Sequence, residues 1–138
     1  MIKMGILAID FGLKRIGIAG SDDLGIASHP VKLLFNDSKE EYFDDILSII
    51  GEREPDLILI GLPIKDDGRL KIQTDIENFA KKLMKLTSIK VTYWNENFTS
   101  KEADEILIKM NVSRKKRKSF QDMLAACLII DSYLRSQK

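Results

Sequence analysis

The stretch Gly5-Ile-Leu-Ala-Ile-Asp-Phe-Gly-Leu-Lys-Arg-Ile-Gly-Ile-Ala-Gly-Ser21 decides the fold. Residues 5–10 form an apolar run typical of a buried strand, and this run ends on the carboxylate of Asp10. Residues 15–21 are predicted to form a second strand. The short connection between the two contains Gly12, which favours an antiparallel hairpin. The chain therefore opens with paired strands and an acidic side chain at the end of the first.

The pattern after this hairpin alternates between strands and helices. A weaker third strand is predicted to follow Gly25 and to run to about Phe35. Ser38 and Glu41 match a capping box, and an apolar stripe follows them with helical spacing. The stripe consists of Tyr42, Phe43, Ile46, Leu47 and Ile50. Residues 56–61 form a continuous apolar run, as expected for a strand that is covered on both faces.

The remaining elements continue this alternation. A second helical stripe consists of Ile72, Ile76, Phe79, Leu83 and Leu86. A fifth strand is predicted from Ile89 to near Glu96. Thr99 and Glu102 match a capping box that would open a third helix. Its inward side chains would be Ala103, Ile106, Leu107 and Met110, and a last helix is predicted to begin near Ser119.

This order predicts an α/β fold in one domain over residues 1–138. Three strands are joined by short links, whereas the two later strands are reached through helices, which implies parallel pairing. We expect a mixed five-stranded sheet flanked by about four helices.

Composition narrows the class of protein. The chain has no apolar run near the ~20 residues that a transmembrane helix needs. It also lacks a signal-peptide pattern, so a cytoplasmic protein is expected. Cys127 is the single cysteine and lies in an apolar helical run, which favours a buried core thiol. The single histidine, His29, has no partner of a kind that would suggest a metal site.

Three carboxylates stand at the ends of predicted elements. Asp10 ends the first strand, Glu96 ends the fifth, and Asp122 lies in the first turn expected for the last helix. Ligand sites gather beyond the carboxyl ends of parallel strands, so the three are expected to converge. Clustered carboxylates repel one another, and Mg²⁺ or Mn²⁺ would compensate their charge. Two such ions can assist phosphodiester cleavage, so we interpret the three residues as metal ligands and catalytic residues.

Each carboxylate also has a structural interpretation. Asp10 precedes a glycine by two positions, which is common in turns. Glu96 could be a solvated charge at a strand end, and Asp122 could stabilise a helix N-terminus. The joint placement of the three therefore carries more weight than any one of them.

Positive charge is concentrated in one segment. The net charge is +1, but residues 114–118 read Arg-Lys-Lys-Arg-Lys, and without them 17 basic residues stand against 21 acidic ones. The candidate phosphate-binding residues are Lys14, Arg15, Arg114, Lys115, Lys116, Arg117 and Lys118. The alternative is a solvated loop that favours solubility. Few aromatic residues stand among these cations, and Tyr93 and Trp94 are expected to pack on the fifth strand.

Four motifs in order resemble those of the YqgF family, also called RuvX, a bacterial family with a ribonuclease H-like fold. The motifs are Ile9-Asp10-Phe11-Gly12-Leu13-Lys14-Arg15-Ile16-Gly17-Ile18-Ala19, Gly61-Leu62-Pro63 with Gly68, Asn95-Glu96-Asn97-Phe98-Thr99-Ser100, and Asp122-Met123-Leu124-Ala125-Ala126. The resemblance covers nearly the whole chain. It departs at Asn95 and Asn97, where the family usually has aspartate and arginine.

The resemblance implies that Asp10, Glu96 and Asp122 bind divalent metal. It also implies a nuclease that processes the 5′ end of precursor 16S ribosomal RNA, with precursor ribosomal particles as partners and either a monomer or a homodimer as the active form.

Three alternatives remain open from the sequence. One is a Holliday-junction resolvase that acts on branched DNA with the same chemistry. Another is a non-catalytic RNA-binding factor in ribosome assembly, which the changes at Asn95 and Asn97 would favour. The last is a nucleotide-binding domain related to actin-like ATPases, although those proteins need two lobes and this chain has room for one.

Overall fold

The computed structural model of the chain describes residues 5–22, 27–37, 39–63, 71–95 and 105–137. Its sheet consists of β1 (Ile6–Phe11), β2 (Arg15–Ser21), β3 (Ser28–Phe35), β4 (Leu57–Leu62) and β5 (Lys90–Asn95). The helices are α1 (Tyr42–Arg53), α2 (Lys71–Leu86) and α4 (Arg114–Ser136), and residues 105–109 are also helical.

The strands form one mixed sheet in the order β3-β2-β1-β4-β5. β2 pairs with both β1 and β3 in antiparallel fashion, whereas β4 pairs with both β1 and β5 in parallel. The links through α1 and α2 are long enough for the crossovers that parallel pairing requires. The predicted mixed five-stranded sheet is therefore confirmed.

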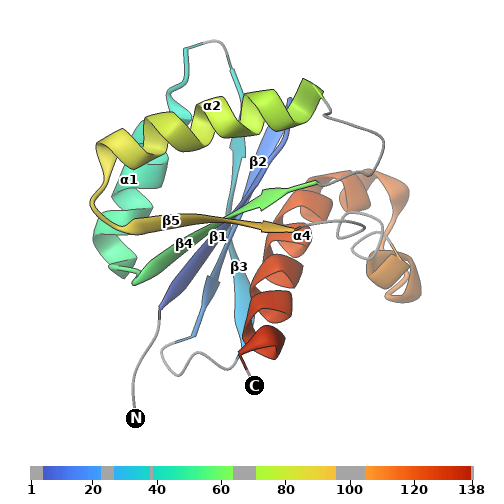
Figure 1. Cartoon of the computed structure of the whole chain (residues 1–138). Helices are drawn as coiled ribbons and strands as arrows, with labels where there is room; N and C mark the ends of the chain where they lie inside the picture. Colours follow the sequence, from blue (N-terminus) through green and yellow to red (C-terminus); the bar gives the residue numbers. More distant parts are fainter. Residues whose placement is uncertain (1–4, 23–26, 38, 64–70, 96–104, 138) are drawn as a thin grey trace.

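Helices cover the two faces of this sheet (Figure 1). On one face α1 and α2 bury a cluster that includes Ile9, Ile46 and Phe79. On the other face α4 packs on a smaller cluster that includes Ala8, Ala19 and Ile129. The small side chains on the α4 face let the helix approach the sheet closely, because they project little from the strands.

The prediction for the last helix was wrong at its beginning. α4 begins at Arg114, so the basic segment forms its first turns and is not a loop. Asp122 consequently lies in the third turn of α4 and not in the first. Charge repulsion within the segment is overcome here because α4 has a long apolar face to bury and Ser113 caps its N-terminus.

Two further details differ from the sequence predictions. The N-cap of α1 is Glu41, which makes no side-chain capping bond, and Ser38 lies outside the described residues. Within residues 105–110, Leu107 is buried as predicted but Met110 is 67% exposed. The helix ends before Met110, and this removes the periodicity on which its inward placement depended. Thr99, Glu102 and Ala103 lie outside the described residues.

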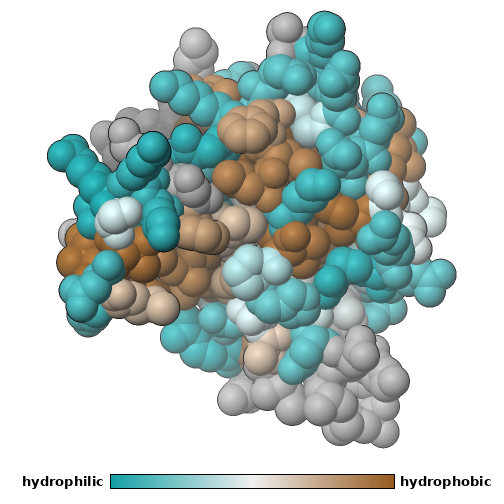
Figure 2. Space-filling model, turned by 180° about the vertical axis from the view of Figure 1, so that it is seen from behind, coloured by the Kyte–Doolittle hydropathy of each residue, from teal (hydrophilic) through white to brown (hydrophobic). Residues whose placement is uncertain are grey.

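The surface is mixed in character. On the side opposite to that of Figure 1, hydrophobic residues gather at the middle and at one flank, among hydrophilic ones (Figure 2). The large apolar side chains that stay exposed include Phe35, Met110 and Phe120. None of the helices in the described ranges has the length and apolar character that crossing a membrane would require.

Candidate active site

Asp10 lies near the carboxyl end of β1 and is buried, with 6% of its surface exposed. Side chains of a strand alternate between its two faces. Ile9 and Phe11 belong to the α1–α2 side, whereas Ala8 belongs to the α4 side. Asp10 therefore lies on the α4 side, as the only acidic residue of a strand that is otherwise apolar. Burial of a carboxylate is costly without compensation, which makes this position unlike an ordinary turn aspartate.

Gly17 connects Asp10 with α4. It is the cross-strand partner of Asp10 in the β1–β2 register. A Cβ atom at Gly17 would overlap the main-chain carbonyl group of Asp122 and the amide nitrogen of Met123. The backbone of α4 thus rests directly on β2 at Asp122, one strand away from Asp10. The main chain of Asp122 therefore lies against the cross-strand partner of Asp10, and the predicted meeting of the two carboxylates stays a prediction.

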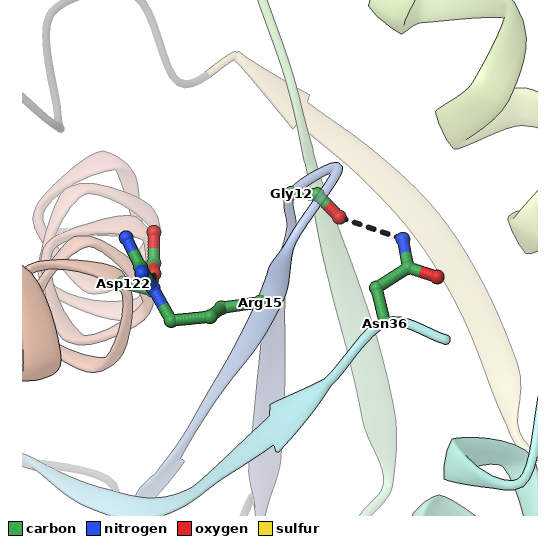
Figure 3. A network of polar contacts seen from close by, with 4 residues as sticks. All are labelled: Gly12, Arg15, Asn36 and Asp122. Atoms are coloured by element: carbon green, nitrogen blue, oxygen red, sulfur yellow. Dashed lines mark hydrogen bonds and ion pairs between the residues drawn. The ribbon is translucent and has the colours of Figure 1, made fainter.

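Arg15 is the ion-pair partner of Asp122. Its Nε donates to Oδ2 of Asp122 at 2.9 Å, between side chains that are 31% and 21% exposed. Figure 3 shows Arg15 reaching from β2 to α4. The sequence pattern indicated phosphate contact for Arg15 and contained no sign of a bond between residues 107 positions apart. Positive charge is thus already present at this end of the sheet.

Asn36 fixes the hairpin that carries Arg15. Its Nδ2 donates to the carbonyl oxygen of Gly12 at 2.8 Å (Figure 3), and its main-chain N–H donates to the carbonyl oxygen of Lys14 at 2.9 Å. Gly12 also donates its N–H to the carbonyl oxygen of Arg15 at 2.9 Å, so closely that a Cβ at Gly12 would collide with that oxygen. Sequence reasoning missed Asn36, because nothing in its neighbourhood marks it.

The parallel strands align their carboxyl ends beside Asp10. Ile9 of β1 pairs with Ile60 of β4, which pairs with Tyr93 of β5. Glu96 is the residue that follows β5, but it lies outside the described residues, so its predicted convergence with Asp10 stays a prediction. Within the described ranges, no three acidic, histidine or cysteine side chains cluster in a way that could hold a metal ion.

The basic segment begins α4, the helix that also carries Asp122. Ser113 caps this helix, with its Oγ accepting from the N–H of Lys116 at 3.3 Å. Arg114, Lys115 and Lys116 are exposed, whereas Arg117 is half-buried and donates to the carbonyl oxygen of Val112 at 3.3 Å. The first turn contains no acidic residue. These cations oppose the helix dipole, which favours negative charge at an N-terminus.

Lys14 and Lys118 complete the candidate phosphate-binding set. Lys14 is exposed on the β1–β2 hairpin beside Arg15. The side chain of Lys118 lies outside the described set.

The remaining candidate groups have structural roles. Burial raises the pKa of the Cys127 thiol to about 11, so it is a protonated core residue as predicted. Trp94 packs against Tyr133 with ring centroids 5.1 Å apart and donates to Oγ of Ser132. Tyr93 packs against the α1–α2 cluster. The predicted packing roles of Tyr93 and Trp94 are confirmed.

Comparison with known structures shows the same fold in two resolvases. *T. thermophilus* RuvC in complex with a Holliday junction aligns with a TM-score of 0.61 at 13% identity, over 96% of each chain. The fowlpox virus resolvase in complex with Holliday junction DNA aligns with a TM-score of 0.60 at 16% identity, over 97% of this chain and 99% of the other. At these identities the likeness concerns the ribonuclease H-like fold.

Sequence comparison is more specific. A protein from *Carboxydothermus hydrogenoformans* is 35% identical over 132 residues, which cover 95% of this chain and 96% of its own. One from *Thermoanaerobacter pseudethanolicus* is 39% identical over 137 residues, covering 98% and 99%. Both carry the name "Putative pre-16S rRNA nuclease". The family described as "RuvX: Holliday junction resolvase" matches residues 4–136. The chain therefore belongs to the RuvX family of nucleases.

Proposed function

We propose that this protein is a metal-dependent endonuclease that processes the 5′ end of precursor 16S ribosomal RNA in the cytoplasm. The observation that carries the proposal is that buried Asp10 lies on the α4 side of the sheet, where its cross-strand partner Gly17 touches the main chain of Asp122. The names of relatives that match nearly the whole chain support the choice of substrate.

The acidic residues suit a hard divalent cation such as Mg²⁺ or Mn²⁺, which prefers carboxylate oxygens. We assign Asp10 and Asp122 as ligands and Glu96 as the third. Held by these residues, such an ion would supply an activated water molecule and compensation for charge on the departing oxygen of a phosphodiester. Arg15 already compensates part of the negative charge of Asp122 in the absence of metal.

The cations around this place would hold the substrate backbone. Lys14 lies on the hairpin beside Arg15, and Arg114, Lys115 and Lys116 are exposed at the beginning of α4. Phosphate contacts of this kind position a nucleic acid without reading its sequence. We include Arg117 and Lys118 in the same set because they continue this basic segment.

The direct test is cleavage of precursor 16S RNA in Mg²⁺ by the wild type, D10N and D122N. Both variants are expected to lose activity by at least about a hundredfold, since each removes a charged metal ligand. D131N is the matched control, because Asp131 is a carboxylate of the same helix that accepts from Ser28 far from Asp10. Equal cleavage by the wild type and D10N would remove the catalytic assignment.

Junction resolution is the second candidate, and the description of the matching family favours it. A four-way DNA junction offered in the same assay distinguishes the two. Paired nicks on the junction with no cut in the precursor RNA would select the resolvase. Binding of RNA without metal, with neither substrate cut, would select a non-catalytic assembly factor.

A further inference from the structure

The Arg15–Asp122 ion pair connects β2 with α4 at the proposed site. Only Nε of Arg15 binds Asp122, and it uses Oδ2 of that carboxylate. A guanidinium group carries five N–H donors, so four remain on its two terminal nitrogens. Both side chains are partly exposed, so a ligand can reach the pair from solvent. Arg15 is thereby placed beside a carboxylate proposed to bind metal, with N–H donors left for a ligand that reaches it from solvent.

We propose that Arg15 is an internal counter-ion of the metal site, which opposes metal binding at Asp122 and binds the substrate phosphate through its terminal nitrogens. The proposal rests on the proposed function. Before metal binds, the guanidinium supplies the positive charge that compensates the carboxylate of Asp122. A divalent ion must then approach Asp122 against this fixed charge, which weakens its binding. Phosphate is a good partner for the terminal nitrogens, because guanidinium groups match its oxygens in pairs.

The proposal makes Arg15 a positioning residue whose removal has opposite effects on two ligands. R15M takes away the repelling charge, so Mn²⁺ binding is expected to tighten by about tenfold. The same change removes phosphate-binding donors, so RNA binding in EDTA is expected to weaken by about tenfold. A merely structural role of the ion pair would weaken both, because loss of the pair would loosen α4 on the sheet.

The experiment measures these two affinities separately. Mn²⁺ is titrated without nucleic acid, with the free ion followed by electron paramagnetic resonance. Binding of an RNA duplex is measured in EDTA, where no cleavage occurs. K81M is the matched control, because Lys81 is an exposed lysine of α2, which covers the face of the sheet opposite to α4 and Asp122. It should leave Mn²⁺ affinity unchanged within twofold.

A second variant separates charge from packing. R15K keeps a positive charge near Asp122 and is expected to retain the weak Mn²⁺ binding of the wild type. Circular dichroism establishes that each variant is folded. If R15M is not folded, R15Q replaces it, because this change removes the charge but keeps a donor for Asp122. The expected changes in Mn²⁺ and RNA affinity are the same.

The outcomes distinguish the inference from the proposed function. If D10N abolishes the Mn²⁺ binding of the wild type, but R15M binds Mn²⁺ no more tightly than the wild type, the role of Arg15 is overturned. The metal site itself would then still stand. Equal Mn²⁺ affinity of the wild type, D10N and D122N would overturn the metal site and the counter-ion together. Tighter metal and weaker RNA binding in R15M alone would support the inference.

Discussion

Gly17 shows how much one residue decides at this site. It is the cross-strand partner of Asp10 and the point where the backbone of α4 touches β2. The positions of Asp10, Glu96 and Asp122 at the ends of predicted elements indicated that these carboxylates are metal ligands. The absence of a side chain at Gly17 is what lets the main chain of α4 at Asp122 rest on β2, because a Cβ atom at this position would overlap it.

G17A should therefore be strongly destabilising. The added methyl group would meet main-chain atoms of α4, which cannot rotate away, so the helix or the strand must shift. We expect the free energy of unfolding to fall by about 2–3 kcal/mol, measured by urea denaturation. G51A is the control, because nothing lies near a Cβ at Gly51 in α1. It should stabilise by about 0.5–1 kcal/mol, and an equal loss in both variants would contradict this explanation.

The buried thiol of Cys127 makes the free energy of unfolding depend on pH in the alkaline range. Burial raises the pKa of its thiol from 9.0 to about 11, with the Asp131 charge acting in the same direction and the Ser28 hydrogen bond opposing it. Between these values the unfolded chain has lost the proton that the folded chain keeps. The contribution of the thiol to the free energy of unfolding is therefore complete below pH 9 and is lost as the pH rises to about 11.

This effect is measured by urea denaturation from pH 8 to 11. The slope of stability against pH should be shallower in C127A than in the wild type. Part of the slope should persist, since burial raises the pKa of Tyr42 from 10.0 to about 12. Identical slopes in the two proteins would show that the thiol ionises alike in both states.

At the scale of elements, the beginning of α4 combines two conflicting requirements. Its first turns carry consecutive cations and no acid, where the helix dipole favours negative charge. Ser113 and the apolar face of α4 keep the segment helical despite this. Such a locally unfavourable arrangement is consistent with a role in binding phosphate.

The double variant K115Q/K116Q should separate binding from stability. We expect the slope of log affinity for RNA against log salt to fall in magnitude by up to about 1.8, with a gain in helix stability of about 0.3–1 kcal/mol. K81Q/K85Q removes two exposed lysines from α2 as a control and should leave the slope unchanged. A slope that is the same in both double variants would exclude Lys115 and Lys116 from the phosphate contacts.

At the scale of the whole molecule, Asp10 sits on the most deeply buried part of the sheet. Every residue of β1 is buried, whereas the edge strand β5 has exposed ends and half-buried residues between them. β1 also pairs on both sides, with β2 and β4. A carboxylate on such a strand is held rigidly, which would favour the fixed geometry that the proposed role of Asp10 as a metal ligand needs.

Hydrogen exchange should reflect this arrangement. Amides of β1 and β4 are expected to exchange most slowly, near the rate of global unfolding, because both strands are paired on two sides and covered by helices. Amides of β3 and β5 should exchange faster, since within the described part of the chain each of these strands is paired on one side only. Mass spectrometry of peptic fragments measures this order, and equal protection of β1 and β5 would contradict it.

The sequence alone determined the elements of the sheet and their directions. Strand periodicity is local, and the lengths of the links decide between antiparallel and parallel pairing, so both can be predicted without coordinates. The position of Asp10 at the end of β1 followed from the same pattern. The extent of α4 did not, because burial of its apolar face on the sheet outweighs local charge repulsion in residues 114–118.

Only the tertiary structure decided which partners meet at the site. Arg15 and Asp122 are 107 positions apart, and their bond depends on α4 resting on β2 at Gly17. Contacts of this kind arise from the packing of complete elements, so no local pattern announces them. The acidic residues could thus be read from the sequence, whereas the cation that holds one of them could be found only in the folded chain.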